Sequence, residues 1–227
     1  FAGMQYRSDI GYRAVVARPP QDADGHIGLG RALEQLGNYE AAEAAFRAAV
    51  QAEPAFWGAY SALGGFLLAR GQADEAIDAF REVTELAPSS ASAHNNLGAA
   101  LQMKGDLRGA AEAYRRSLAI EPASSAYSNL GTLEYFLRDY AEAAANYERA
   151  IAIAGQDQTL WGNLADALWQ MPGRREEAIG MYRRAISLAQ RELESNPADG
   201  LLLAQLGYYH GRTGDAERSR DYLEQAA

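Results

Sequence analysis

The sequence predicts an all-α solenoid of about six helix-turn-helix repeats, preceded by a half repeat. One pattern carries this prediction: a leucine and a small residue, an alanine, a bulky ring and a proline recur at fixed offsets. The pattern returns in steps of 34 residues, and a period of about 20 to 50 residues is typical of stacked repeats. The three most regular copies are Leu29, Gly30, Ala42, Phe46 and Pro54, then Leu63, Gly64, Ala76, Phe80 and Pro88, then Leu97, Gly98, Ala110, Tyr114 and Pro122.

The repeats divide the chain in order, and we expect residues 1–227 to form one elongated domain. Pro197 comes 19 residues after Ala178 instead of the usual 12, which predicts a longer second helix in the fifth repeat. The predicted segments are a half repeat at residues 5–20, then repeats at residues 23–56, 57–90, 91–123, 124–157, 158–199 with the extended helix, and a truncated repeat at 200–227.

Each repeat has the residue types that two antiparallel helices need. A glycine in the first helix lets the second helix approach closely, and a bulky residue of the second helix fills the space between neighbours. Another glycine falls where the first helix must end and the chain must reverse. The close-approach glycines are Gly30, Gly64, Gly98, Gly131 and Gly207, the bulky residues are Phe46, Phe80, Tyr114, Tyr147 and Tyr182, and the turn glycines are Gly37, Gly71, Gly105 and Gly214.

This pattern resembles the tetratricopeptide repeat (TPR) family from Gln5 to Ala227. The resemblance implies a right-handed superhelix whose first helices line a concave groove for a partner. The fourth and fifth repeats also resemble C-terminal repeat arrays of bacterial signalling proteins. That second resemblance implies a docking arm, with an effector domain expected before Phe1.

Composition narrows the class of partner. The net charge is -9 and the isoelectric point is about 4.9, which disfavours nucleic acid and anionic membranes. The chain has no cysteine, so disulfide and thiolate chemistry are excluded, and both a cytoplasmic and a periplasmic location remain open. We expect no membrane insertion, because no apolar run approaches the roughly 20 residues of a membrane helix.

Sequence signatures of catalysis are absent. The chain has no GxxxxGK loop, no HExxH and no GxSxG, so we expect no enzymatic activity, no catalytic residue, no cofactor and no metal. Asp22 and Asp24 are interpreted as the start of a helix. The three histidines, His26, His94 and His210, occupy positions that are apolar or aromatic in other repeats, and we expect them to lie at core or interhelix positions.

A column of amides is predicted on the groove face, six residues into successive repeats. A side-chain amide offers one acceptor and two donor hydrogens, so such a column could bind the backbone of an extended peptide. This arrangement is similar to the asparagine ladder of peptide O-GlcNAc transferases. The alternative is that the amides bond neighbouring helices. The column consists of Asn96, Asn129, Asn163 and Gln205.

Hydrogen bonds alone fall short of the cost of association, so apolar anchors are also required. The repeat offsets place Tyr135, Phe136, Trp169, Tyr208 and Met103 on the same face. If any of these side chains packs between repeats instead, we expect it to be Phe136 first. The predicted function is therefore a non-enzymatic scaffold that binds an extended peptide or partner segment. The alternative is a substrate-recognition extension of a larger enzyme, such as a peptide glycosyltransferase or sulfotransferase.

The two ends of the array lack a polar covering helix, which terminal repeats normally need. We expect the parent protein to continue on the N-terminal side. Self-association through an uncovered end repeat is the secondary expectation.

Overall fold

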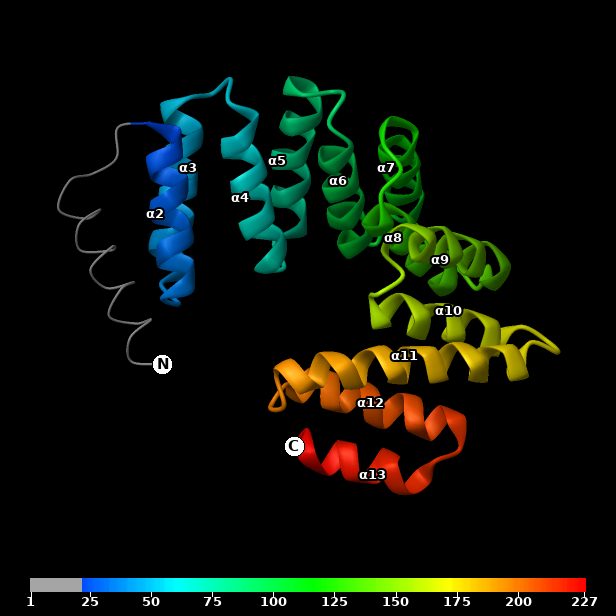
Figure 1. The fold of residues 1–227 in the computed structure, drawn as a ribbon. Helices are drawn as coiled ribbons and strands as arrows, with labels where there is room; N and C mark the ends of the chain where they lie inside the picture. The colour runs from blue at the N-terminus through cyan, green and yellow to red at the C-terminus, as the bar shows by residue number, and fades with distance from the viewer. Residues whose placement is uncertain (1–21) are drawn as a thin grey trace. The chain divides into compact units, whose positions relative to one another are not determined.

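The computed structural model describes residues 22–227, and this part of the chain contains twelve helices and no strand (Figure 1). The all-α, helix-turn-helix prediction is therefore confirmed. The half repeat predicted at residues 5–20 lies outside the described residues. The chain divides into two compact units, Phe1–Ile120 and Glu121–Ala227.

In the first unit, three helix pairs follow one another. Within each pair the two helices pack together, and each second helix also contacts the first helix of the next pair. These helices are α2 (Ala23–Gln35), α3 (Tyr39–Ala52), α4 (Trp57–Ala69), α5 (Ala73–Leu86), α6 (Ala91–Lys104) and α7 (Leu107–Ile120).

The second unit repeats this arrangement. Its helices are α8 (Ser124–Phe136), α9 (Tyr140–Ala154), α10 (Gln158–Gln170), α11 (Arg175–Ser195), α12 (Gly200–Thr213) and α13 (Ala216–Gln225). Here α9 contacts α10, α11 contacts α12, and α8 touches α10 directly, so the first helices lie side by side. Helix α11 has 21 residues, and Pro197 stands just beyond its end.

Close approach within most pairs depends on a glycine of the first helix, whereas the α10–α11 pair has Ala165 at this position. A methyl group at Gly98 would lie 2.6 Å from the Tyr114 ring, and one at Gly64 would lie 2.9 Å from the Phe80 ring. Both distances are too short for van der Waals contact, so the ring occupies the space that a side chain would take. The same fit recurs at Gly207, where the obstructing side chain is Leu223.

The turn between the two helices of a pair contains a residue with positive φ, and in most repeats this residue is glycine. Gly37, Gly71, Gly105 and Gly214 have φ between 74° and 89°, as the sequence predicts. In the fourth repeat Arg138 takes this conformation with φ 64°. A non-glycine residue with positive φ is strained, so this turn is less favourable than its counterparts.

Most of the described helix starts are capped by short polar side chains, whereas α4, α5, α8 and α11 have no side-chain cap. Asp22 accepts a hydrogen bond from the backbone N–H of Gly25 at 2.7 Å, which agrees with its interpretation as a helix start. The side chains of Asn38, Ser90, Asp139, Asp157, Asp199 and Asp215 also cap helices.

Candidate functional site

The most distinctive surface of the described chain lies on the second unit, where side chains of α10, α11 and α12 meet. We call it the Trp169 cluster, and it consists of Asp166, Trp169, Arg175, Tyr182, Tyr208 and Arg212. Asp166 and Trp169 come from α10, Arg175 and Tyr182 from α11, and Tyr208 and Arg212 from α12. Figure 1 shows these three helices beside one another.

Asp166 connects two tyrosines from different helices. Its Oδ1 accepts hydrogen bonds from the hydroxyls of Tyr182 and Tyr208, both at 2.5 Å. Arg212 Nε in turn donates to the Tyr182 hydroxyl at 3.0 Å. These bonds cross from α10 to α11 and α12, so they fix the rings relative to one another.

The aromatic rings form one continuous group. The Tyr182 ring lies edge-on to Trp169, with centroids 6.2 Å apart, and edge-on to Tyr208 at 6.1 Å. Two guanidinium groups lie over the Trp169 ring, that of Arg175 at 4.1 Å and that of Arg212 at 3.9 Å from its centroid. Arg–indole contacts of this kind are attractive and stack a planar cation on a ring face.

The cluster keeps its phenol groups protonated. Burial raises the pKa of Tyr182, and the hydrogen bond to Asp166 raises it further. Burial and the same carboxylate also raise the pKa of Tyr208. Both hydroxyls therefore remain hydrogen-bond donors to Asp166, because ionising either would place a second negative charge beside the carboxylate.

Two of the predicted anchors, Trp169 and Tyr208, thus belong to one cluster. Tyr208 keeps 43% of its surface exposed, although its hydroxyl and its ring are both held in place. Tyr135 lies on α8 and is joined to α10 through Gln170, whose Nε2 donates to the Tyr135 hydroxyl at 3.5 Å. Helices α8, α10 and α12 therefore share one face, which we call the first-helix face of the second unit.

The alternative that Phe136 packs between repeats is wrong. Phe136 is 68% exposed and does not pack between repeats. Tyr135 is partly buried: it packs against the core, and its ring lies edge-on to that of Tyr140, with centroids 5.4 Å apart. Phe136 is the last residue of α8, so its ring extends past the packed part of the helix.

Only part of the amide column could bind the backbone of a partner peptide. Gln205 accepts a hydrogen bond from Gln158 Nε2 at 2.9 Å, so it bonds a neighbouring first helix, as the alternative interpretation holds. Gln158 is buried, and its Oε1 accepts a hydrogen bond from the Tyr209 hydroxyl at 3.0 Å. Asn129 and Asn163 are half-buried, and Asn129 has an interaction within the protein.

The remaining predicted residues, Asn96 and Met103, lie on α6 of the first unit. Asn96 is half-buried and Met103 is 51% exposed near the end of the helix. Neither belongs to an aromatic group comparable to the Trp169 cluster.

Sequence reasoning missed Asp166, Arg175 and Arg212 as members of the site. Spacing could have indicated two of them, since Asp166 precedes Trp169 by three positions and Arg212 follows Tyr208 by four. Residues at these spacings share one face of a helix. Arg175 belongs to another helix, and only the packing of α11 against α10 brings it to Trp169.

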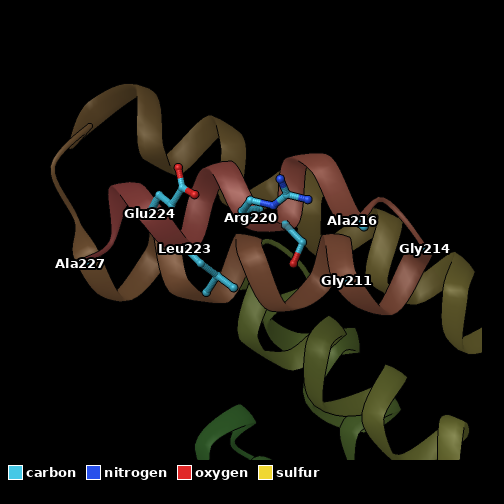
Figure 2. Close-up of a pocket in the computed structure, with 8 residues that line it drawn as sticks. Gly211, Gly214, Ala216, Arg220, Leu223, Glu224 and Ala227 are labelled. Carbon is cyan, nitrogen blue, oxygen red and sulfur yellow. The ribbon is translucent and has the colours of Figure 1, made fainter.

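A second surface feature is a hollow of 510 Å³ on α12 and α13 (Figure 2). Leu223, Ala216 and Gly211 line it, together with one arginine, Arg220, and one glutamate, Glu224. Helix α13 has no buried residue. The hollow is therefore an uncovered helix face, without a buried polar group to orient a small molecule.

Within residues 22–227, no group of three or more histidine or acidic side chains could hold a metal ion. None of the described helices has the length and apolarity required to span a membrane. His210 is buried against Tyr222, at a core position as predicted. His94 is half-buried, and its Nε2 lies 3.1 Å from the carbonyl oxygen of Pro88, in the turn before its own helix.

Comparisons with known structures give the fold. A chain of the APC/C hetero-tetramer Cut9–Hcn1 is 17% identical over 99% of this chain, with a TM-score of 0.72, and this chain spans 43% of its length. PilW, a type IV pilus biogenesis factor, is 18% identical with a TM-score of 0.72, covering 89% of this chain and 91% of PilW. YrrB, a TPR protein with an unusual peptide-binding site, is 18% identical with a TM-score of 0.54, covering 80% and 90%.

Family models agree along the sequence, whereas no curated protein matches the chain. Models described as tetratricopeptide repeat match residues 12–60, 91–124, 124–156 and 156–227, and one described as TPR repeat matches residues 67–105. The 34-residue period, the glycine and ring pairs and the stacked helix pairs have the same explanation: the chain belongs to the tetratricopeptide repeat family.

Proposed function

We propose that this protein is a non-enzymatic interaction scaffold, and that the first-helix face of its second unit binds an extended segment of a partner protein. The observation that carries the proposal is the Trp169 cluster. Tyr208 is 43% exposed beside the partly buried Trp169, and hydrogen bonds hold the tyrosines of the cluster in one arrangement. Interface hot spots are enriched in tryptophan, tyrosine and arginine, and all three residue types meet here.

Preorganisation is the physical advantage of this arrangement. Binding normally loses affinity when side chains must be immobilised, by about 0.5 to 1.5 kcal/mol for each flexible side chain. Tyr208, Tyr182 and Arg212 are already tied together through Asp166 in the unbound protein. A partner residue that packs against Trp169 and Tyr208 therefore meets a surface whose ordering cost was met during folding.

The amides of α8 and α10 supply the polar part of the proposed site. Asn163 stands on the same helix as Trp169, and Asn129 on the same helix as Tyr135. A side-chain amide can bond both an N–H and a C=O of an extended backbone. Gln205 contributes less in this proposal, since its acceptor oxygen already bonds Gln158. The described peptide site of YrrB, which has the same fold, supports a peptide as the partner.

Selection from a random peptide library displayed on phage tests the proposal. Peptides enriched on the whole protein are synthesised, and their Kd is measured by fluorescence anisotropy. Trp169→Ala is expected to weaken binding by about 30-fold, the loss typical of a hot-spot residue. Asn129→Ala is expected to weaken it by several-fold, through a lost hydrogen bond of about 1 kcal/mol.

Trp57→Ala is the matched control. Trp57 is 46% exposed on α4 of the first unit and has no arginine over its ring among the described contacts. It is expected to leave the peptide Kd unchanged. The proposal is wrong if no peptide is enriched, or if Trp169→Ala and Trp57→Ala behave alike.

A second copy of the chain is the second candidate partner. The observation that favours it is the uncovered apolar face of α13, where Leu223 is exposed beside the hollow of Figure 2. Light scattering over a concentration series tests this idea. A dimer that Leu223→Arg abolishes is the expected result, and a monomer at every concentration excludes it.

A further inference from the structure

His210 is the one described residue whose side chain has a buried nitrogen or oxygen without a hydrogen-bond partner. Its Nε2 bonds nothing within residues 22–227, and only 3% of the residue is exposed. Its Nδ1 lies 3.6 Å from a carboxylate oxygen of Asp215, which is too long for a good hydrogen bond. Buried polar groups in folded proteins are nearly always paired, so the position of His210 requires an explanation.

The other repeats show which side chain packing alone would favour at this position. Leu33, Leu67 and Leu101 have the same repeat offset in the first unit, and all three are buried. A leucine has no polar atom that needs a partner. Histidine, in contrast, is the residue type whose charge changes near neutral pH.

Protonation of His210 in the packed hairpin would bury a charged N–H that has no acceptor. Burial lowers the pKa of His210, Asp215 acts in the opposite direction, and Arg218 lowers the pKa again. These two charged groups belong to the start of α13, and none of the charges that act on His210 in the described chain comes from α11. The last turn of α12 favours a cation, but it gives Nε2 no partner.

Helix α13, which covers His210, is the least firmly packed of the described second helices. It has no buried residue, whereas α3, α5, α7, α9 and α11 each bury four or more. The hollow of Figure 2 borders α13, and the Tyr222 ring of α13 stacks on His210 with centroids 5.4 Å apart. Elements with little buried surface open locally at a low free energy, so α13 can separate while the other helices stay packed.

From this geometry we infer that α13 is a pH-sensitive helix, which separates from α12 when His210 takes up a proton in mildly acidic solution. Separation removes the Tyr222 ring from His210 and gives the protonated ring access to water. The Trp169 cluster does not depend on α13, since Tyr208 and Arg212 are bonded to residues of α10 and α11. The inference therefore goes beyond the proposed peptide binding and does not rest on it.

The size of the effect follows from the difference between the closed and the open hairpin. In the open hairpin His210 has its ordinary pKa of 6.5, and in the closed hairpin its pKa is lower. The packing of α13 is therefore fully stable above pH 6.5 and weakens as the pH falls toward the pKa of the closed state. At about pH 5.5 the open fraction should be up to about 10-fold larger than at about pH 7.5.

Hydrogen–deuterium exchange of the whole protein, followed by mass spectrometry of its peptides, tests the inference. Exchange rates are divided by those of an unstructured chain at the same pH, which leaves the protection due to structure. In the unmodified chain, protection of α13 should fall by up to about 10-fold between about pH 7.5 and about pH 5.5, and that of α9 should change much less. His210→Leu should give α13 equal protection at both pH values.

Three further variants sharpen the test. His210→Gln keeps a polar side chain that does not titrate, and it should also remove the pH dependence. His94→Leu is the matched control, because His94 is half-buried on α6 of the first unit, and it should leave the change at α13 in place. Asp215→Asn keeps a side chain that can cap α13 but removes the carboxylate that favours the protonated ring, so the change should come closer to about 10-fold.

Three outcomes would overturn the inference. They are equal protection of α13 at both pH values in the unmodified chain, a pH dependence that both His210→Leu and His210→Gln retain, and an equal loss of protection at α9 and α13. Peptide binding is measured separately, and His210→Leu should bind selected peptides as the unmodified chain does. A peptide library that yields no binder would contradict the proposed function and leave this inference standing.

Discussion

The two units of this protein share one way of packing helices but differ in the side chains that their first helices present. In the second unit, Asp166 and Trp169 help to build a cluster of rings, arginines and hydrogen bonds. The corresponding repeat offsets in α4 of the first unit hold Gly65 and Leu68. The first unit therefore has the scaffold without the cluster.

If the proposed function holds, stacking and recognition use different positions of the repeat. Stacking depends on a glycine and a ring that fit each other inside the pair, as Gly64 and Phe80 do in the first unit and Gly131 and Tyr147 in the second. The offsets of Asp166 and Trp169 in the first helix do not take part in this glycine–ring fit.

An arginine over an aromatic ring does not by itself make a site. In the first unit, Arg70 lies 4.0 Å from the ring of the exposed Tyr39, much as Arg212 lies over Trp169. Among the described residues, no second aromatic ring contacts Tyr39, and the pair shares no carboxylate acceptor. What distinguishes the second unit is the connection of several such contacts through Asp166.

The largest expected loss of stability comes from Tyr182, whose ring belongs both to the core and to the Trp169 cluster. Tyr182 is fully buried, and Tyr182→Ala should reduce the free energy of unfolding by about 3 to 5 kcal/mol, the usual cost of removing a core ring. Phe80→Ala should cost a similar amount in the first unit. Chemical denaturation monitored by circular dichroism measures both.

Tyr182→Phe serves as the control that separates the ring from its hydroxyl. It keeps the packing and removes the bonds to Asp166 and Arg212, so it should cost only about 1 to 2 kcal/mol. A cost for Tyr182→Phe as large as that for Tyr182→Ala would contradict the view that packing dominates at this position.

A smaller effect is expected at the turns, where the units also differ. Arg138 has φ 64°, whereas Gly105 occupies the equivalent turn of the first unit with φ 88°. Arg138→Gly should stabilise the protein by about 0.5 to 1 kcal/mol, since it relieves the left-handed strain but makes the unfolded chain more flexible. Gly105→Ala should destabilise it by about 1 kcal/mol. Urea unfolding should therefore give changes in the free energy of unfolding of opposite sign for the two variants. Changes of the same sign would contradict this prediction.

The smallest effect concerns pH. Burial lowers the pKa of His210 below its usual 6.5, and Asp215 opposes this only in part. The unfolded chain therefore binds the proton more readily, so stability is fully present above pH 6.5 and falls as pH drops toward the folded pKa. His210→Leu places the leucine of other repeats at this position and should flatten the dependence. A stability profile that His210→Leu leaves unchanged would show that other groups are responsible.

Much of the fold could be predicted from the sequence because the same packing residues recur at the same spacing in successive repeats. Gly98 and Tyr114 are 16 residues apart, as are Gly64 and Phe80, and the structure brings each pair into contact. The site could be predicted only in part. Trp169 and Tyr208 do share the cluster, whereas Phe136 extends into solvent and Gln205 bonds another helix.

The sequence by itself determined the helix pairs, their turns and the residues that fit between them, because those constraints act over short spacings and recur every 34 residues. Only the tertiary structure decided that Asp166, Tyr182, Arg175 and Arg212 gather around Trp169. These contacts join three helices and depend on which side-chain rotamers the packing allows, and no spacing along a single helix contains that information.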